Sequence, residues 1–212
     1  MSLYDVRGDS EAGVAEAVAA LRRGELAVLP TDTVYGIAAD AFSPPAVTRL
    51  LEAKGRGRDL PVPVLVGSWR GIDGLADDVD ARTRTLVEQC WPGPLTLIVR
   101  AAPSLAWDLG QTRGTVAVRM PLHQVALAVL AETGPLAVSS ANRTGEPPAT
   151  TAEQAQTSLG FAVSVYLEAG STGEAVASSI VDLTGSRPVL RRAGALGTDE
   201  LRTLLPDLQV AP

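Results

Sequence analysis

The sequence predicts an α/β fold built on a twisted, mixed β-sheet with flanking helices. Segments with helical spacing of apolar residues alternate with short apolar runs typical of buried strands. Several of these runs follow one another through a turn, which favours a mixed sheet over a purely parallel one. At 212 residues, 46% of them hydrophobic and 20% charged, the chain is long enough for one sizeable core. We therefore expect a single domain over residues 1–212.

The N-terminal third of the chain contains two helix signals, each followed by a strand signal. Ser10 is a suitable N-cap for the first helix, and Gly24 ends it. Ser43 and the two prolines after it start the second helix, which runs to about Lys54. The expected strands of this part are 26–30, 37–41 and 61–67.

The rest of the chain continues the alternation. Thr150, with Glu153 three residues later, is typical of a capping box at the start of a short helix. The other expected helices cover 79–89 and 122–133 and a segment after Thr198. The expected strands are 95–100, 115–120, 136–140, 163–167, 179–183 and 189–192.

Charge and composition exclude several classes of protein. A formal net charge of −6 argues against sequence-independent binding of nucleic acid, which depends on Lys and Arg. Cys90 and His123 are the only cysteine and histidine, so neither an intrachain disulfide nor a Cys/His zinc cluster can form. The N-terminal residues lack an apolar signal region, and no apolar run is long enough to span a membrane. We expect a cytoplasmic protein without membrane contact.

Three polar strings stand at the ends of predicted strands: PTDTVYG at 30–36, KGRGR at 54–58 and SSAN at 139–142. Lys54, Arg56 and Arg58 could bind a phosphate chain or a carboxylate, although a solvated basic loop has the same composition. The residues of the first string either supply hydroxyl donors to a ligand or cap a turn, and the same choice holds for the third. Arg119, at the end of another strand, binds a carboxylate or pairs with a structural acid. No GxxxxGK[ST], GxGxxG, GxSxG or HExxH motif is present.

Six strings, in this order, resemble the YrdC-like family of threonylcarbamoyl-AMP synthases. They are PTDTVYG, Lys54-x-Arg56, PGPLT at 92–96, TVAVRMP at 115–121, SSANRTGEP at 139–147 and SSIVD at 178–182, so that the match covers about residues 3–196. The resemblance implies a single YrdC-like domain with a concave ligand cleft, in the short form without an extra C-terminal domain.

The resemblance also implies an activity and a set of site residues. The family makes threonylcarbamoyl-AMP and pyrophosphate from L-threonine, bicarbonate and ATP, for a downstream transferase complex that modifies tRNA. By motif position, threonine would be bound by Thr33, Arg119 and Ser178, and ATP by Arg56, Thr115, Ser140, Asn142 and Arg192. Lys54 and Arg56 would be catalytic, with Lys54 beside the phosphates. Mg²⁺ would be held mainly by the nucleotide phosphates, with no protein metal site.

Several positions depart from the family pattern. Gly57 replaces a common proline, Leu60 an asparagine, Leu65 a histidine near threonine, and Pro148 a serine near ATP. Either Arg191 or Arg192 could face ATP.

Two alternative functions remain open at this point. One is an RNA-binding protein of the same fold without synthase activity; for the synthase itself, the resemblance allows only a weak contact with tRNA. The other is a carbamoyl-transfer relative that uses another acceptor.

Overall fold

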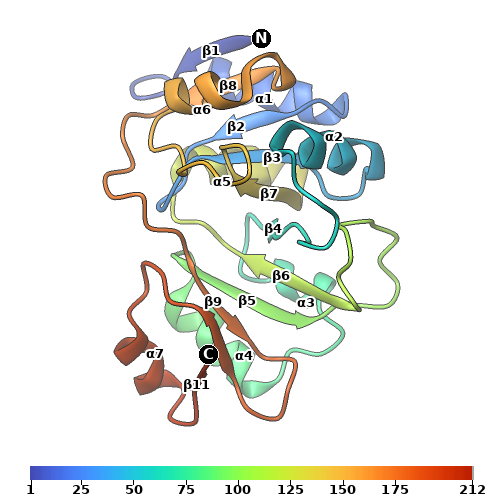
Figure 1. Ribbon diagram of the computed structural model, residues 1–212, viewed down its shortest axis with the longest axis vertical. Coiled ribbons are helices and arrows are strands. Elements are labelled where there is room, and N and C mark those ends of the chain that lie inside the picture. Colours follow the sequence, from blue (N-terminus) through green and yellow to red (C-terminus); the bar gives the residue numbers. More distant parts are fainter. Residues whose placement is uncertain (212) are drawn as a thin grey trace.

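One mixed sheet of eleven strands runs through residues 1–211, the part of the chain that the structure, a computed structural model, describes (Figure 1). Its strands are β1 (Ser2–Asp5), β2 (Ala27–Leu29), β3 (Gly36–Asp40), β4 (Val64–Leu65), β5 (Leu95–Arg100), β6 (Thr115–Arg119), β7 (Leu136–Ser140), β8 (Val165–Glu168), β9 (Ser179–Asp182), β10 (Val189–Arg192) and β11 (Gln209–Val210). The helices are α1 (Glu11–Arg22), α2 (Pro44–Lys54), α3 (Gly71–Leu75), α4 (Ala81–Cys90), α5 (Gln124–Thr133), α6 (Ala152–Leu159) and α7 (Thr198–Leu204), with a 3-10 turn η1 (Gly160–Ala162).

The sheet has the strand order β1-β8-β2-β3-β7-β4-β6-β5-β9-β10-β11. Parallel pairs such as β2 with β8 and β5 with β9 alternate with antiparallel pairs such as β3 with β7 and β5 with β6. The strands change direction from the top to the bottom of Figure 1, as the natural twist of a large sheet requires. The predicted mixed, twisted sheet with flanking helices is confirmed.

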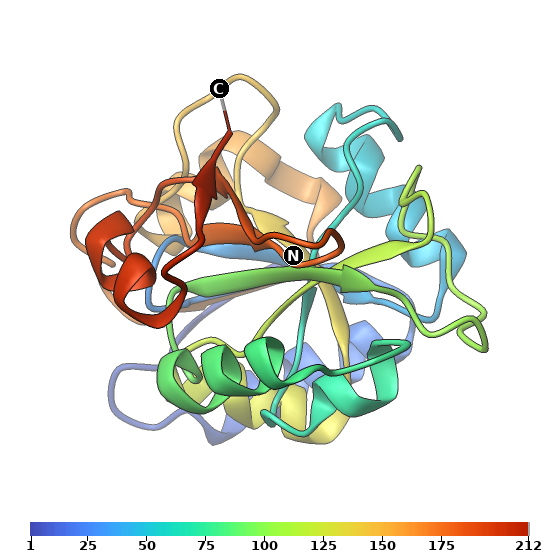
Figure 2. The ribbon, with the colours of Figure 1, turned by 90° about the horizontal axis from the view of Figure 1, so that it is seen from below.

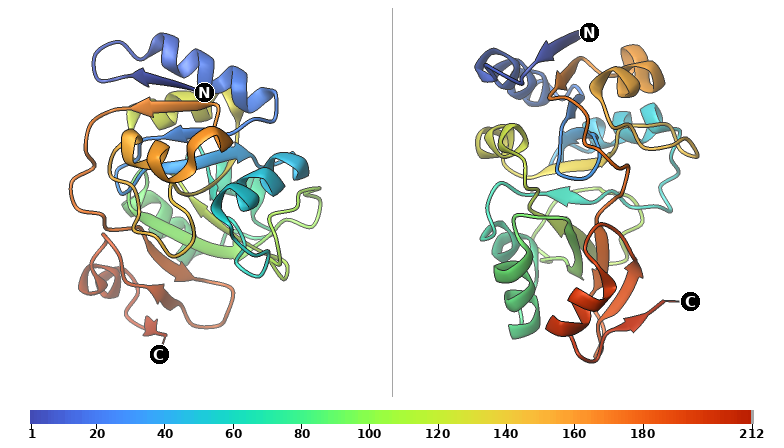
Figure 3. Two further views of the ribbon diagram at one scale, coloured as in Figure 1. Left: turned by 45° about the horizontal axis from the view of Figure 1, so that its top comes forward. Right: turned by 90° about the vertical axis from the view of Figure 1, so that its left-hand side faces the viewer.

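The helices cover the sheet from two sides. Figure 2 and the right-hand view of Figure 3 show α1, α3, α4 and α5 along one side and α2, α6 and α7 along the other. A cluster of buried residues joins α1 and α5 to strands β2, β3, β7 and β8. A larger cluster joins α2 and α6 to the sheet and continues beneath α3 and α4. These two clusters hold the strand ends that carry the polar strings in fixed positions.

Sequence patterning located most elements but placed several ends wrongly. The run 61–67 contains only the two-residue strand β4, because Pro61 and Pro63 interrupt the backbone pairing. Ser10 and Ser43 stand at the N-cap positions of α1 and α2 without a side-chain capping hydrogen bond. Helix α6 is capped by Thr151, not Thr150: Thr151 Oγ1 accepts from the backbone N–H of Gln154 at 3.2 Å.

The face of β6 that carries Arg119 also carries polar residues of the neighbouring strand. Alternation along β6 places Thr115, Ala117 and Arg119 on one face, and Val116 and Val118 in the core on the other. The register pairs Ile98 with Ala117 and Arg100 with Thr115, so the alternate residues of β5 belong to the same face. Thr115 and Arg119 therefore share a face but lie about 13 Å apart, at opposite ends of the strand.

Candidate functional site

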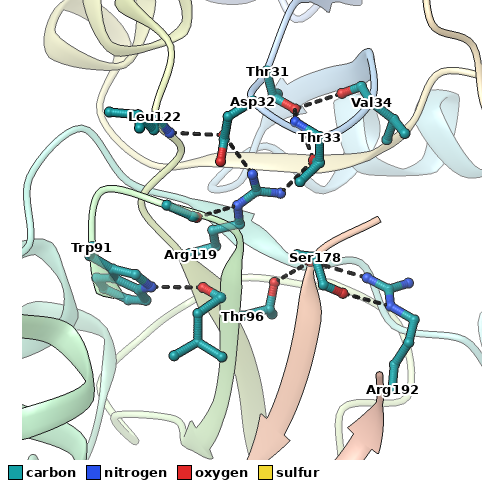
Figure 4. Close-up of polar contacts among 12 residues, drawn as sticks. Thr31, Asp32, Thr33, Val34, Trp91, Thr96, Arg119, Leu122, Ser178 and Arg192 are labelled. Atoms are coloured by element: carbon teal, nitrogen blue, oxygen red, sulfur yellow. Dashed lines mark hydrogen bonds and ion pairs between the residues drawn. The ribbon is translucent and has the colours of Figure 1, made fainter. Parts of the chain in front are cut away.

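Arg119 is the centre of a buried hydrogen-bond network, drawn in Figure 4. Its Nε donates to the Gly93 carbonyl at 2.9 Å, and one terminal nitrogen donates to Thr33 Oγ1 at 2.9 Å. The other terminal nitrogen forms a 2.6 Å ion pair with Asp32. Only 6% of Arg119 is exposed, and this burial lowers its pKa, which the Asp32 carboxylate partly offsets. A guanidinium has five N–H donors, so one remains on each terminal nitrogen for a ligand.

The loop between β2 and β3 supplies Thr33 and Asp32. Thr31 Oγ1 donates to the Val34 carbonyl at 2.6 Å and lies 3.1 Å from Thr33 Oγ1. The backbone N–H of Leu122 donates to Asp32 Oδ1 at 2.8 Å, which ties this loop to the start of α5. The turn-capping interpretation of PTDTVYG therefore holds for Thr31. The ligand-binding interpretation stays a prediction for Thr33, whose hydroxyl contacts Arg119. Tyr35 is fully buried and donates to the Gly170 carbonyl, which is a structural contact.

Ser178 and Arg192 stand beside this network, at the ends of β9 and β10. Ser178 Oγ lies 2.8 Å from Thr96 Oγ1, and Arg192 reaches both the Ser178 carbonyl and its hydroxyl at 2.9 and 3.1 Å. Arg192 also lowers the pKa of Arg119, so the two charges are close enough to interact. Arg191 points away and pairs with Asp182 at 2.7 Å. The structure therefore directs Arg192, and not Arg191, toward Ser178.

Lys54 is buried where α2 ends. Its Nζ donates to the carbonyls of Ser140 and Asn142 at 2.5 and 2.6 Å, which leaves one of its three N–H donors. Burial, followed by the charge of Arg56, lowers the pKa of Lys54 to about 8. The basic string is therefore not a solvated loop at this position, because only 3% of Lys54 is exposed.

Arg56 folds back along its own loop and across to β7. It donates to the carbonyls of Leu60 and Pro61 at 2.8 and 3.0 Å, and to Ser139 Oγ at 3.1 Å. Burial lowers its pKa, and Arg192 contributes to the same shift. Arg192 lowers the pKa of both Arg56 and Arg119, which indicates that the three positive charges lie near one another.

The SSAN string joins Lys54 and Arg56 from the side of β7. Asn142 donates through its amide to the carbonyls of Arg143 and Glu146, both at 2.8 Å, and so shapes the loop after β7. Its Oδ1 is buried without a hydrogen-bond partner within residues 1–211. Ser140 meets Lys54 through its backbone carbonyl, whereas the side chain that meets Arg56 is that of Ser139.

Thr115 lies apart from the other predicted residues. Its Oγ1 donates to the Thr112 carbonyl at 2.8 Å, and it lines an open hollow of about 400 Å³ together with Arg100, Arg113 and Thr184. The hollow lies at the far end of the β6 face from Arg119. Thr115 can therefore reach only a ligand long enough to cross this face.

Sequence reasoning assigns no specific role to three residues of this network. Asp32 and Ser139 are among the string residues that either meet a ligand or cap a turn, and Thr96 is part of a predicted strand. Alternation along β5 could have found Thr96, because it is the polar residue between the buried Leu95 and Leu97. Leu65, where the family pattern has histidine, is buried and pairs in register with Arg119.

No helix among residues 1–211 is long and apolar enough to cross a membrane. Within the same range, no group of three or more His, Cys, Asp or Glu side chains could hold a metal ion.

A mixed α/β sheet with a basic, hydroxyl-rich site at its strand ends is typical of a protein that binds anionic ligands. Comparison with known proteins identifies the family. The sequence profile of the Sua5/YciO/YrdC family, described as "Telomere recombination", matches residues 19–194. The chain belongs to this family.

Relatives of this chain share its sequence and its fold. A "Putative threonylcarbamoyl-AMP synthase" of Mycobacterium tuberculosis is 54% identical over 193 residues, which are 91% of this chain and 89% of that protein. The threonylcarbamoyl-AMP synthase of Bacillus subtilis is 35% identical over 99% of this chain and 61% of its own length. The crystal structure of P. abyssi Sua5 complexed with L-threonine superposes on this chain with a TM-score of 0.96, at 33% sequence identity. The superposition includes 100% of this chain and 63% of the P. abyssi chain.

Proposed function

We propose that this protein is a threonylcarbamoyl-AMP synthase, which joins L-threonine, bicarbonate and ATP. The observation that carries the proposal is that four cations, Lys54, Arg56, Arg119 and Arg192, are each held by hydrogen bonds to residues of the six strings that match the family. The relatives named as synthases and the threonine complex of P. abyssi Sua5 support it.

Threonine would occupy the end of the site at Arg119. The two free N–H groups of Arg119 suit the substrate carboxylate; the Thr33 hydroxyl contacts the same guanidinium, and the Ser178 hydroxyl lies on Thr96 of the neighbouring strand. This arrangement would hold the amino group in place beside the carbonate carbon, so that the protein needs to supply orientation but no nucleophile of its own.

ATP would lie between the basic loop and β7 and extend along β6. Arg56, Ser140, Asn142 and Arg192 would surround its phosphates and sugar, and Thr115 would contact its far end, which the length of a nucleoside triphosphate allows. The remaining N–H of Lys54 would stabilise the charge that develops on the phosphates. Mg²⁺ would come with ATP, bound by phosphate oxygens and water.

The reaction balances without a covalent enzyme intermediate. An N–C bond forms between the threonine amine and the bicarbonate carbon, while the C–OH bond of bicarbonate breaks and its hydroxyl leaves as water with a proton from the amine. An O–P bond then forms between the resulting carbamate and the α-phosphorus, the α,β P–O bond of ATP breaks, and pyrophosphate leaves. The product would pass to a tRNA-modifying transferase complex in the cytoplasm.

Threonine-dependent release of pyrophosphate tests this proposal. Purified protein with ATP, bicarbonate and Mg²⁺ should release pyrophosphate when L-threonine is added, and not when glycine replaces it. Absence of threonine-dependent release would contradict the proposal. Tight, salt-sensitive binding of tRNA without affinity for ATP would favour the RNA-binding alternative, and turnover of carbamoyl phosphate would favour the carbamoyl-transfer alternative.

A further inference from the structure

The carboxylate of Asp32 is buried beside Arg119 with one oxygen unpaired. Its Oδ1 accepts hydrogen bonds from Arg119 at 2.6 Å and from the Leu122 N–H at 2.8 Å. Its Oδ2 is buried and has no hydrogen-bond partner within residues 1–211. Leaving a buried polar atom unsatisfied costs about 1–3 kcal/mol, and more when the group is charged. Such atoms are rare in folded proteins and call for an explanation.

The groups around Asp32 leave this oxygen without an internal partner. Arg119 donates its hydrogen bond to Oδ1 of Asp32 and not to Oδ2. His123 lies close enough for the Asp32 charge to act on its pKa, which burial lowers, but its ring forms no hydrogen bond with Oδ2. The Nδ1 of His123 is itself buried and has no partner within residues 1–211. Asp32 also belongs to no group of metal-ligating side chains in the described chain.

Arg119 and Asp32 together present opposite charges side by side. Arg119 keeps one N–H on each terminal nitrogen, and Asp32 keeps one carboxylate oxygen. An α-amino acid carries a carboxylate and an ammonium group on the same carbon atom. A zwitterion of this kind matches the free donors of Arg119 and the free acceptor of Asp32 at once.

We propose that Asp32 selects a free amino acid as substrate, by accepting a hydrogen bond from its α-ammonium group through Oδ2 while Arg119 holds its carboxylate. This inference rests on the proposed function and adds to it a residue that determines specificity. Because Oδ2 and most of Arg119 are covered in the free protein, the proposal requires that the loop of Thr31 to Val34 shifts when the amino acid enters.

The proposal predicts that compounds without the ammonium group bind more weakly than an amino acid. An α-hydroxy acid would satisfy Arg119 but would offer Asp32 a hydroxyl in place of a charged donor. Hydrogen bonds to charged groups are about twice as strong as neutral ones. The site should therefore discriminate against (2S,3R)-2,3-dihydroxybutanoate, which differs from L-threonine only by a hydroxyl in place of the ammonium group.

Equilibrium binding of these two compounds to wild type and to Asp32→Asn tests the proposal. Wild type should bind L-threonine at least about tenfold more tightly than dihydroxybutanoate, as expected for a charged hydrogen bond. The asparagine of the variant is close in shape to the aspartate and can still accept from Leu122 and Arg119, but it presents an NH₂ where Oδ2 was. In this variant the ratio should fall below about threefold, whereas Asp32→Glu, which keeps the charge, should retain discrimination.

The controls separate this inference from the proposed function. Asp73→Asn removes an exposed carboxylate that pairs with Arg84, and it should leave the ratio unchanged. Nucleotide binding by the same samples shows whether each variant is folded. A ratio that is unchanged in folded Asp32→Asn, or a wild type that binds both compounds equally, would overturn the role of Asp32 while leaving the synthase proposal intact. A wild type that binds neither compound would overturn both.

Discussion

At the scale of single residues, the site depends on cations that burial holds in fixed positions. Lys54 and Arg119 are almost completely covered, and each donates to protein oxygens while keeping N–H groups for a ligand. Because their partners are mostly backbone carbonyls, the positive charges are not neutralised, apart from the pairing of Arg119 with Asp32. Such preorganised charge is what a reaction between anions requires.

Removing either cation of the basic loop should strongly reduce turnover. We expect Lys54→Ala and Arg56→Ala each to lower kcat by about a hundredfold or more, the effect of losing about 3 kcal/mol of charge stabilisation. Steady-state pyrophosphate release measures this change. Arg202→Ala, which removes an exposed arginine of α7, is the matched control and should retain full activity. Near-normal turnover in Lys54→Ala would show that the buried ammonium has no part in the reaction.

The low pKa of Lys54 predicts a pH limit on activity. Its pKa of about 8 lies below the usual 10.5, so the ammonium form is complete well below pH 8 and is lost as the pH rises through this value. If the charged form is required, kcat/KM for ATP should fall above about pH 8, since this ratio reports groups of the free enzyme. Lys54→Arg should move the fall to higher pH, because guanidinium stays protonated. A profile that stays flat to about pH 10 would contradict the account.

At the scale of secondary-structure elements, strand and helix ends position the site, and the ends are where sequence prediction was weakest. The strands β5, β6 and β7 were predicted within one residue because their apolar runs are continuous. In contrast, β1 and β11 are short and largely exposed, and α3 has only five residues, so none of them shows a clear period.

Prediction from sequence is also incomplete for the residues of the site. Motif resemblance found Thr33, Lys54, Arg119 and Ser178, which the structure places in or beside the polar network. Asp32 and Thr96 also stand within the matching strings, but the resemblance assigned them no role, because their contacts are made across the sheet with residues far apart in sequence. Nor could spacing alone decide between Arg191 and Arg192, since the register shifts between Leu190 and Arg192 in the pairing of β10 with β9.

The cap of α6 offers a test at this scale. Thr151→Ala removes the hydroxyl that accepts from Gln154 N–H, and it should lower the free energy of unfolding by about 1 kcal/mol. Urea unfolding followed by circular dichroism measures the difference. Thr157→Ala, an exposed change in the same helix, should have little effect or stabilise slightly. Equal losses in both variants would argue against Thr151 as the cap.

At the scale of the whole molecule, one buried cluster links distant parts of the sheet. It contains residues from Leu26 near β2 to Leu208 near β11, and it includes Trp91. We therefore expect the chain to unfold as one unit, as the prediction of a single domain also requires.

Two spectroscopic probes can test this expectation. All three tryptophans belong to the stretch of sequence between the end of α2 and the start of β6, so their fluorescence reports the unfolding of that part. Far-UV circular dichroism reports the secondary structure of the whole chain. The two unfolding transitions in urea should coincide. Separate midpoints would mean that the sheet divides into two cooperative units.

The central claim is that one site joins threonine, bicarbonate and ATP, and double labelling of the product tests it most directly. The protein would be incubated with ATP, ¹⁴C-bicarbonate and ³H-threonine, and the AMP adduct would be separated and counted. The account predicts one ATP-dependent adduct that carries both labels in equal molar amounts. An adduct with tritium but without ¹⁴C, as in a simple aminoacyl adenylate, or the absence of any adduct, would contradict it.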